Sequence, residues 1–249
     1  MLLEERIALV TGAGQGNGAA IAKGLAKEGA RIIATDLNGE AAERTAREVV
    51  ESGGEAWAYT LDVADAEACK ALARDVETSI GQVSILVNNA GICPRNTIDS
   101  PDVMRLWDAA MQVNLNGTLN VTLAFVPALR ATKGTVINMA SIASFVSTST
   151  SISYSTSKAA VRMLTQNLAQ ELAKDGVRVN AIAPGTLNTP MTEATRTNPE
   201  RAERFLSRIP LGRFGEPEEL VGPTVFLASN MSTYVTGTTL VVDGGYLAV

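Results

Sequence analysis

Short runs of apolar residues alternate with longer amphipathic segments along the whole chain. Such runs suit strands that are buried on both faces, whereas apolar residues spaced three or four apart suit helices packed on one side. The pattern predicts seven strands, at about 7–10, 31–35, 56–61, 84–87, 135–138, 178–182 and 239–242. Strands that alternate with helices indicate repeated βαβ units. The predicted fold class is therefore α/β, a single doubly wound parallel sheet with helices on both faces.

The helical segments fall between these runs. They are expected from the glycine-rich turn to about 28, over 38–52, 66–80 and 103–130, from near Tyr154 to about 174, and over 218–228. A stretch rich in Thr, Arg and Pro covers about 186–216 and is long for an ordinary connection. It suits a substrate-binding lid, and equally a pair of short surface helices. Residues 1–249 are otherwise expected to form a single domain.

Composition narrows the function classes. With 249 residues, 46% hydrophobic residues and 21 glycines, the chain can bury one large α/β core. The net charge of -5 and the lack of a basic cluster argue against a nucleic-acid partner. Cys69 and Cys93 are far apart and there is no histidine, so no metal site is expected. No run of about 18 apolar residues occurs, which predicts a cytoplasmic protein without membrane contact.

A glycine-rich turn follows the first predicted strand. Gly12, Gly14, Gly16 and Gly18 lie between that strand and the next helix. Glycines allow a tight turn and close approach of the backbone to a ligand, and the helix N-terminus supplies free N–H groups for a pyrophosphate. The turn alone is also compatible with a merely flexible loop.

Asp36 makes the nucleotide interpretation stronger. It ends the second predicted strand, 18 residues after Gly18, where a carboxylate can accept hydrogen bonds from an adenosine ribose. A carboxylate would repel the 2′-phosphate of NADP, and neither Gln15 nor Leu37 provides a cation. The expected cofactor is therefore NAD, although Asp36 could instead be a helix cap or turn former.

Tyr154 and Lys158 form a candidate proton-transfer pair. Residues four apart share one helix face, so the phenol and the ammonium can point into the same cleft. A nearby positive charge is expected to lower the pKa of the phenol. Ser141 follows the fifth strand and could hold a substrate oxygen, with Ser144 as a nearby rival. An isolated pair of this kind would more often be an exposed tyrosine and a solvated lysine.

Six motifs in register give a family resemblance. They are Thr11-Gly12-x-x-x-Gly16-x-Gly18, Asn88-Asn89-Ala90-Gly91, Asn114, Ser141, Tyr154-x-x-x-Lys158 and Pro184-Gly185. In order and spacing the chain resembles the short-chain dehydrogenase/reductase family, in its branch of roughly 250 residues and nearly from end to end. This implies a Rossmann-type sheet and a nicotinamide cofactor. One departure is Asn17, where the family usually has Ile or Leu.

The resemblance assigns residues to three groups. The catalytic residues would be Asn114, Ser141, Tyr154 and Lys158, with Lys158 also bound to the nicotinamide ribose and Asn114 supporting a water relay. The cofactor would contact Gly12, Gln15, Gly16, Asn17, Gly18, Asp36, Leu37, Asp62, Val63, Asn89, Ala90, Gly91, Tyr154, Lys158, Pro184, Gly185, Leu187 and Thr189. The substrate would lie against Ser141 and Tyr154; Cys93 and Ala143 are expected beside it from their places just after strand ends, and Arg95 could approach one rim. The family also implies a homo-oligomer, commonly a tetramer.

The predicted activity is NAD-dependent interconversion of a secondary alcohol and a ketone, with Tyr154 as the acid and base. The substrate could be a polyol, a sugar alcohol or a diol, and 3-oxoacyl thioester reduction stays open. A catalytically silent nucleotide-binding scaffold is the hypothesis from another class, and the presence of all four catalytic residues argues against it. Enoyl reductases of this superfamily usually space their Tyr and Lys more widely, which argues against that activity.

Overall fold

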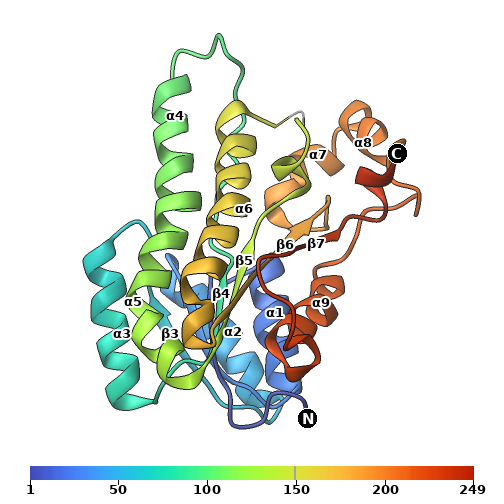
Figure 1. Ribbon diagram of the computed structural model, residues 1–249. Helices are drawn as coiled ribbons and strands as arrows, with labels where there is room; N and C mark the ends of the chain where they lie inside the picture. The colour runs from blue at the N-terminus through green and yellow to red at the C-terminus, as the bar shows by residue number, and fades with distance from the viewer. Residues whose placement is uncertain (149) are drawn as a thin grey trace.

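Seven parallel strands form one sheet in the computed structural model, which describes residues 1–148 and 150–249 (Figure 1). The order across the sheet is β3-β2-β1-β4-β5-β6-β7. The strands are β1 (Ile7–Thr11), β2 (Arg31–Asp36), β3 (Ala56–Thr60), β4 (Ile85–Asn88), β5 (Thr135–Met139), β6 (Arg178–Pro184) and β7 (Thr239–Val242). The predicted doubly wound sheet is confirmed, and each predicted strand end lies within two residues of the observed one.

Helices cover both faces of this sheet (Figure 1). One face carries α1 (Gly16–Lys27), α2 (Gly39–Glu51) and α9 (Val221–Ala228), and the other carries α3 (Ala66–Ser79), α5 (Gly117–Thr132) and α6 (Ile152–Leu172). Side chains alternate along a strand, so Ala8 and Val10 of β1 pack toward the first layer while Ile7 and Leu9 pack toward the second. Burial on both faces explains why the strands have continuous apolar sequences.

The long helix predicted over 103–130 is not one regular α-helix. It consists of α4 (Val103–Ala110), a wider π-helical segment (Met111–Asn116) and then α5. Such a widening is frequent at functional sites. Here it contains the buried Asn114, whose side chain is held by a loop outside the helix.

Short helices occupy the long stretch between β6 and β7. After a 3-10 turn (Pro190–Thr192) come α7 (Glu193–Arg196) and α8 (Pro199–Leu206), so the alternative of short surface helices describes this stretch. Another 3-10 turn (Pro217–Leu220) precedes α9, where a single helix over 218–228 was expected. The stretch lies beside the carboxyl ends of the strands, near the C-terminus of the chain (Figure 1).

The sheet changes winding direction between β1 and β4. In open α/β sheets, ligands bind in the crevice outside the carboxyl ends of the strands at such a point. A cavity of about 330 Å³ lies there. A larger hollow of about 990 Å³, bordered by Lys23, Arg31 and Glu48, lies at the amino ends of the strands, away from any candidate catalytic group. Among the described residues no helix is both long and apolar enough to span a membrane.

Candidate functional site

One cavity brings together most of the residues expected to bind cofactor and substrate. Of the predicted residues, its walls contain Gly12, Gln15, Gly16, Asn17, Asp36, Leu37, Asp62, Val63, Asn89, Ala90, Gly91, Ser141, Tyr154, Lys158, Pro184, Gly185, Leu187 and Thr189. These residues come from the ends of several strands and from the segment after β6. The sheet therefore gathers into one site residues that are up to 177 positions apart, from Gly12 to Thr189.

The glycine-rich turn is shaped by close backbone contacts. Gly12 has a φ of +61°, and a Cβ there would lie 2.9 Å from the Cα of Ala90. Gly18 does not border the cavity, and a Cβ on it would lie 2.1 Å from the carbonyl oxygen of Gly12. Gly18 therefore allows α1 to pack against the turn, while Gly12 and Gly16 line the cavity itself.

Asp36 is held in place by backbone N–H groups. Its Oδ2 accepts from Gly14 N at 2.9 Å and its Oδ1 from Asn38 N at 3.0 Å. The cap of α2 is Asn38, whose Oδ1 accepts from Ala41 N at 3.2 Å. Asp36 is therefore not the helix cap, and its carboxylate borders the cavity beside the exposed Leu37.

Asn89 supports the turn. Its Nδ2 donates to the carbonyl oxygens of Thr11 and Gly12, both at 3.0 Å. The backbone N–H groups of Asn89 and Ala90 donate in turn to the Thr11 hydroxyl, also at 3.0 Å. The amide donors expected to meet a ribose are thus engaged by the protein, so the visible role of Asn89 is to fix the turn.

Asp62 behaves in a similar way. Its Oδ1 accepts from Ala64 N at 2.9 Å, which closes a small turn after β3. Asp65, and not Asp62, caps α3 by accepting from the N–H groups of Glu67 and Ala68. Asp62 therefore lines the cavity, and the cap of α3 is a different residue.

Tyr154 enters the cavity from the first turn of α6, which is capped by Ser151. Burial raises the pKa of the phenol, and Cys93 acts in the same direction. A hydrogen bond from Ser141 and the positive charge of Arg95 act in the opposite direction. The expected lowering of the Tyr154 pKa is therefore wrong for this structure, because loss of hydration is the dominant influence.

Lys158 is not among the groups that shift the pKa of Tyr154. Its Nζ donates to the carbonyl oxygen of Met139 at 2.7 Å, and the residue is only 6% exposed. Burial lowers the pKa of Lys158 to about 8, with Cys93 acting in the opposite direction. The lysine lies beside the reactive tyrosine, but its ammonium group points at a carbonyl and its own charge is disfavoured.

The structure also separates the two candidate serines. Ser141 is 7% exposed, borders the cavity, and accepts a hydrogen bond from Ala143 N at 3.1 Å. Ser144 instead donates its hydroxyl to the carbonyl oxygen of Lys158 at 2.7 Å. Ser141 is therefore the serine available to a substrate, and Ser144 ties the loop to α6.

Asn114 acts as a clamp behind this group. Its Oδ1 accepts from Ile92 N at 2.8 Å, and its Nδ2 donates to Ile92 O at 3.0 Å and to the Ser157 hydroxyl at 2.9 Å. A Cβ on Gly91 would lie 3.1 Å from Asn114 Oδ1 and 3.4 Å from Lys158 Nζ. Asn114 does not border the cavity, so its visible role is to position the backbone around Lys158.

Two predicted substrate contacts lie outside this cavity. Cys93 is half-buried in the loop after β4, where burial raises the pKa of its thiol. Ala143 borders a neighbouring hollow of about 730 Å³ together with Asn96 and Ser155. The cavity lining therefore does not include Cys93 or Ala143, although Cys93 lies close enough to influence the pKa of Tyr154.

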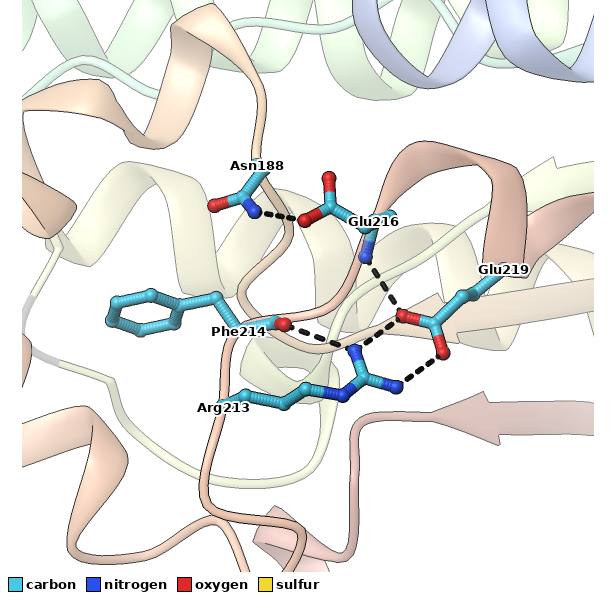
Figure 2. Close-up of polar contacts among 5 residues, drawn as sticks. All are labelled: Asn188, Arg213, Phe214, Glu216 and Glu219. Carbon is cyan, nitrogen blue, oxygen red and sulfur yellow. Dashed lines mark hydrogen bonds and ion pairs between the residues drawn. The ribbon is translucent and has the colours of Figure 1, made fainter.

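The stretch after β6 is closed at its base. Leu187 pairs with Gly215 in a parallel bridge, and Asn188 N donates to Gly215 O at 2.8 Å. Figure 2 shows that Asn188 also donates its side chain to Glu216, while Arg213 pairs with Glu219. The pairing with Arg213 holds the pKa of the Glu219 carboxyl at about 2. The two ends of the segment that borders the cavity are thus fastened side by side.

Comparisons with known proteins agree with this geometry. A family model described as Enoyl-(Acyl carrier protein) reductase matches residues 12–247. The chain is 41% identical to the 3-oxoacyl-[acyl-carrier-protein] reductase of Thermotoga maritima, over 98% of this chain and 99% of that protein. It is also 41% identical to the galactitol 2-dehydrogenase (L-tagatose-forming) of Cereibacter sphaeroides, over 98% and 96%.

A solved structure has a closely similar fold. The gluconate 5-dehydrogenase of Burkholderia cenocepacia, in complex with NADP and tartrate, has a TM-score of 0.94 at 38% identity, with 99% of this chain and 97% of that chain covered. The chain belongs to the short-chain dehydrogenase/reductase family. Like other members it is an oxidoreductase built to bind a nicotinamide dinucleotide, and its dehydrogenase relatives oxidise secondary alcohols.

The residues of this family member fit such a dinucleotide. Gly12 and Gly16 border the cavity with positive φ and without side chains, and Gln15, the N-cap of α1, makes no side-chain hydrogen bond to the first N–H groups of that helix. Asp36 borders one end of the cavity and Lys158 the other. Gly12 and Gly16 would hold the pyrophosphate, Asp36 the adenosine ribose, and Lys158 the nicotinamide ribose.

Several groups around the site could not be predicted from the family motifs. Ser157 is fully buried and links Asn114 to the carbonyl oxygen of Tyr154. The carbonyl oxygen of Met139 anchors Lys158. Ser157 carried a weak signal, being a hydroxyl one turn after Tyr154, but a backbone acceptor carries none. The cavity also includes Leu61, Ile92, Val113, Met139, Ala140, Pro190, Met191 and Thr192.

Proposed function

We propose that this protein is an NAD(H)-dependent oxidoreductase that interconverts a secondary alcohol of the polyol, sugar-alcohol or diol class with the corresponding ketone. The observation that carries the proposal is the joining, in one cavity, of Tyr154, Lys158 and Ser141 with the glycine-rich turn and Asp36. Proton-transfer groups at one end and ribose and pyrophosphate groups at the other are what hydride transfer to or from a nicotinamide requires.

The bound dinucleotide supplies the hydride chemistry, and the protein supplies positioning and a proton. The Ser141 hydroxyl holds the substrate oxygen next to the phenol of Tyr154. Tyr154 takes the hydroxyl proton in oxidation and returns it to the ketone oxygen in reduction. The Lys158 ammonium, held by the carbonyl oxygen of Met139, is the proton donor next to Tyr154. Asn114 fixes the loop at Ile92.

The raised pKa of Tyr154 gives the two directions opposite pH dependence. The phenol is protonated at neutral pH, which is the form that donates to a ketone. Reduction should therefore be fastest near neutral pH, whereas oxidation should keep rising toward alkaline pH as phenolate forms.

NAD is favoured over NADP because of the charges in the cavity. Asp36 is the carboxylate nearest to the expected adenosine ribose, and Leu37 beside it is uncharged. The only cation that borders the cavity among the described residues is Lys158, next to Tyr154. A 2′-phosphate would meet a negative charge with no cation to offset it, even though the Burkholderia cenocepacia relative was obtained with NADP.

Cofactor choice can be tested by following absorbance at 340 nm with a panel of polyols, diols and hydroxyacyl thioesters. We expect kcat/KM to be at least about 100-fold higher with NAD than with NADP, and Asp36→Asn to narrow that ratio about tenfold, since removing a charge at such a site is worth one to two kcal/mol. Equal or better rates with NADP in the unaltered protein would contradict the role of Asp36.

The relatives support two substrate types. Galactitol, named for the Cereibacter sphaeroides enzyme, is a neutral polyol, and gluconate, named for the Burkholderia cenocepacia enzyme, is a polyhydroxy acid. The Thermotoga maritima relative favours the second candidate function, reduction of a 3-oxoacyl thioester. Acetoacetyl thioester reduction that exceeds polyol oxidation would favour that candidate. NADH binding without turnover of any compound in the panel would favour a silent nucleotide-binding scaffold.

Assembly, the lid and location complete the proposal. Met104 of α4, Leu123 of α5 and Met163 of α6 are 65%, 58% and 54% exposed, which supports a homo-oligomer, with a tetramer implied by the family. Light scattering that shows a 26 kDa species would contradict it.

We further propose that residues 186–216 act as a lid over the cavity. We also propose that the protein works in the cytoplasm, where its two unpaired thiols, Cys69 and Cys93, stay reduced.

A further inference from the structure

Arg95 is a cation in the loop that connects the catalytic end of the cavity to the lid. It follows Cys93 and Pro94 after β4 and is half-buried. Its Nη2 donates to the hydroxyl of Thr195 in α7 at 2.5 Å, and Thr195 is only 3% exposed. This contact joins residues 100 positions apart and places the guanidinium between the loop and the lid.

No carboxylate pairs with Arg95 among residues 1–148 and 150–249. Four other arginines of this protein do have such partners, among them Arg105 with Asp102 and Arg130 with Asp175. A guanidinium has five N–H donors, and the Thr195 hydroxyl is the one acceptor that the described residues provide to Arg95. A partly buried cation with unused donors is unfavourable unless an anion completes it.

The charge of Arg95 reaches the reacting groups. It lowers the pKa of Tyr154 and of Cys93, in opposition to burial, so the guanidinium lies near both. The next residue, Asn96, has a buried Nδ2 and Oδ1 without hydrogen-bond partners in the part of the chain that the structure describes. An unpaired cation therefore lies beside an unpaired amide. Neither residue borders the cavity, but Arg95 is near enough to act on the pKa of the Tyr154 phenol.

We propose that Arg95 binds a carboxylate of the substrate, and that the substrate is accordingly a polyhydroxylated carboxylic acid rather than a neutral polyol. The inference rests on the proposed function, because Arg95 must reach the carboxylate of a substrate whose reacting hydroxyl is held by Ser141 and Tyr154. A guanidinium can bind a carboxylate through two parallel hydrogen bonds, which fixes orientation as well as affinity. The carboxylate is unchanged by the reaction: the carbinol carbon gives up a hydride to NAD, and the hydroxyl proton passes to Tyr154.

Matched pairs of substrates test the inference. Gluconate and glucitol differ by a carboxylate in place of a hydroxymethyl group, as do galactonate and galactitol. We expect the unaltered protein to oxidise the acids with a kcat/KM about 100-fold above that for the alditols, and Arg95→Met to reduce this ratio by at least about tenfold, mostly through KM for the acid. Arg95→Lys should restore only part of the ratio, because it keeps the charge and loses the paired donors.

Arg130→Met is the matched control, since it removes a surface arginine near the end of α5, which pairs with Asp175 at the amino end of the sheet. It should leave the acid-to-alditol ratio unchanged. A ratio near one in the unaltered protein, or equal loss on acids and alditols in Arg95→Met, would show that Arg95 only fastens the lid to the loop through Thr195. Turnover of alditols without any preference for acids would thus overturn this inference and leave the proposed function standing.

A binding measurement separates the two failures. The fluorescence of the NADH complex is titrated with gluconate and, in parallel, with glucitol. If neither gluconate nor glucitol is oxidised, the proposed substrate class is wrong. Saturable binding of gluconate that Arg95→Met weakens at least about tenfold would still support a carboxylate site. Absence of gluconate binding to the NADH complex of the unaltered protein would overturn it.

Discussion

At the end of the cavity that holds Asp36, polar groups are held by the backbone in a fixed shape, whereas at the end that holds Tyr154 two ionisable side chains are buried. Asp36 accepts from two backbone N–H groups and Asn89 donates to two carbonyls. Tyr154 and Lys158 are instead buried where their charged forms are disfavoured. Binding a dinucleotide needs a backbone of fixed shape, whereas proton transfer needs side chains whose pKa values are shifted by burial. Burying such groups costs folding free energy, so the catalytic end should contribute less to stability than the cofactor end.

The largest effect should come from removing the phenol. Tyr154→Phe deletes the group proposed to move the proton, so we expect turnover to fall by at least about 10³-fold. NADH binding, measured by fluorescence, should change by less than about twofold, because the cofactor end is already formed without that hydroxyl. Tyr234→Phe, which alters a fully exposed tyrosine, is the control. Substantial activity in Tyr154→Phe would exclude Tyr154 as the acid and base.

Lys158 tests whether the catalytic end is destabilising. Its pKa is about 8 in the folded protein, below the 10.5 of an exposed lysine, so the unfolded chain binds more protons between these values and stability rises with pH there. Lys158→Met should therefore raise the free energy of unfolding by up to about 3 kcal/mol at neutral pH. The gain should shrink as pH rises from about 8 to above 10.

Denaturant unfolding of both proteins across that pH range measures this difference. A Lys158→Met variant that is less stable than the parent at pH 7 would mean that the contact with Met139 outweighs the burial of charge.

Gly14 tests the other end. A Cβ there would lie 2.6 Å from the Cβ of Ala41 and 2.8 Å from Asp36 Oδ2. Gly14→Ala should therefore displace the carboxylate, weaken NADH binding about tenfold and lower the free energy of unfolding by about 1–3 kcal/mol. Gly222→Ala is the matched control, since a Cβ at Gly222 meets nothing within 4 Å. Unchanged NADH affinity in Gly14→Ala would show that the exact placement of Asp36 matters little.

Asn17 is an exception at the cofactor end, and changing it should have the smallest effect. Its Oδ1 is buried without a hydrogen-bond partner in the described part of the chain. Asn17→Leu removes that unsatisfied oxygen and should stabilise the protein without cofactor by about 1 kcal/mol. Thermal unfolding without NADH is the measurement, and a lower midpoint in the variant would indicate that the amide stabilises the turn.

Local patterns were sufficient for the sheet and for much of the site. The run Ile7–Val10 is apolar because β1 is covered on both faces, and the four residues proposed as catalytic stand at spacings that the sheet converts into proximity. The π-helical segment was missed because it depends on Asn114 reaching Ile92, 22 positions away.

The direction of the Tyr154 pKa was missed for a related reason. The spacing of Tyr154 and Lys158 indicates that they are neighbours, but it does not reveal that the lysine donates to Met139 or how deeply both are buried. The contact between Arg95 and Thr195 likewise joins segments that no local pattern connects.

The fastening of Leu187 to Gly215 has a consequence for how this scaffold could change its substrate. The segment between them leaves and re-enters the body of the protein at one place, where Asn188, Glu216 and Glu219 already hold it (Figure 2). Its length can vary at little entropic expense, because the ends stay joined whatever lies between. The helices α7 and α8 within it can therefore be exchanged, by evolution or by an engineer, while the base of the segment from Leu187 to Thr192 continues to border the cavity.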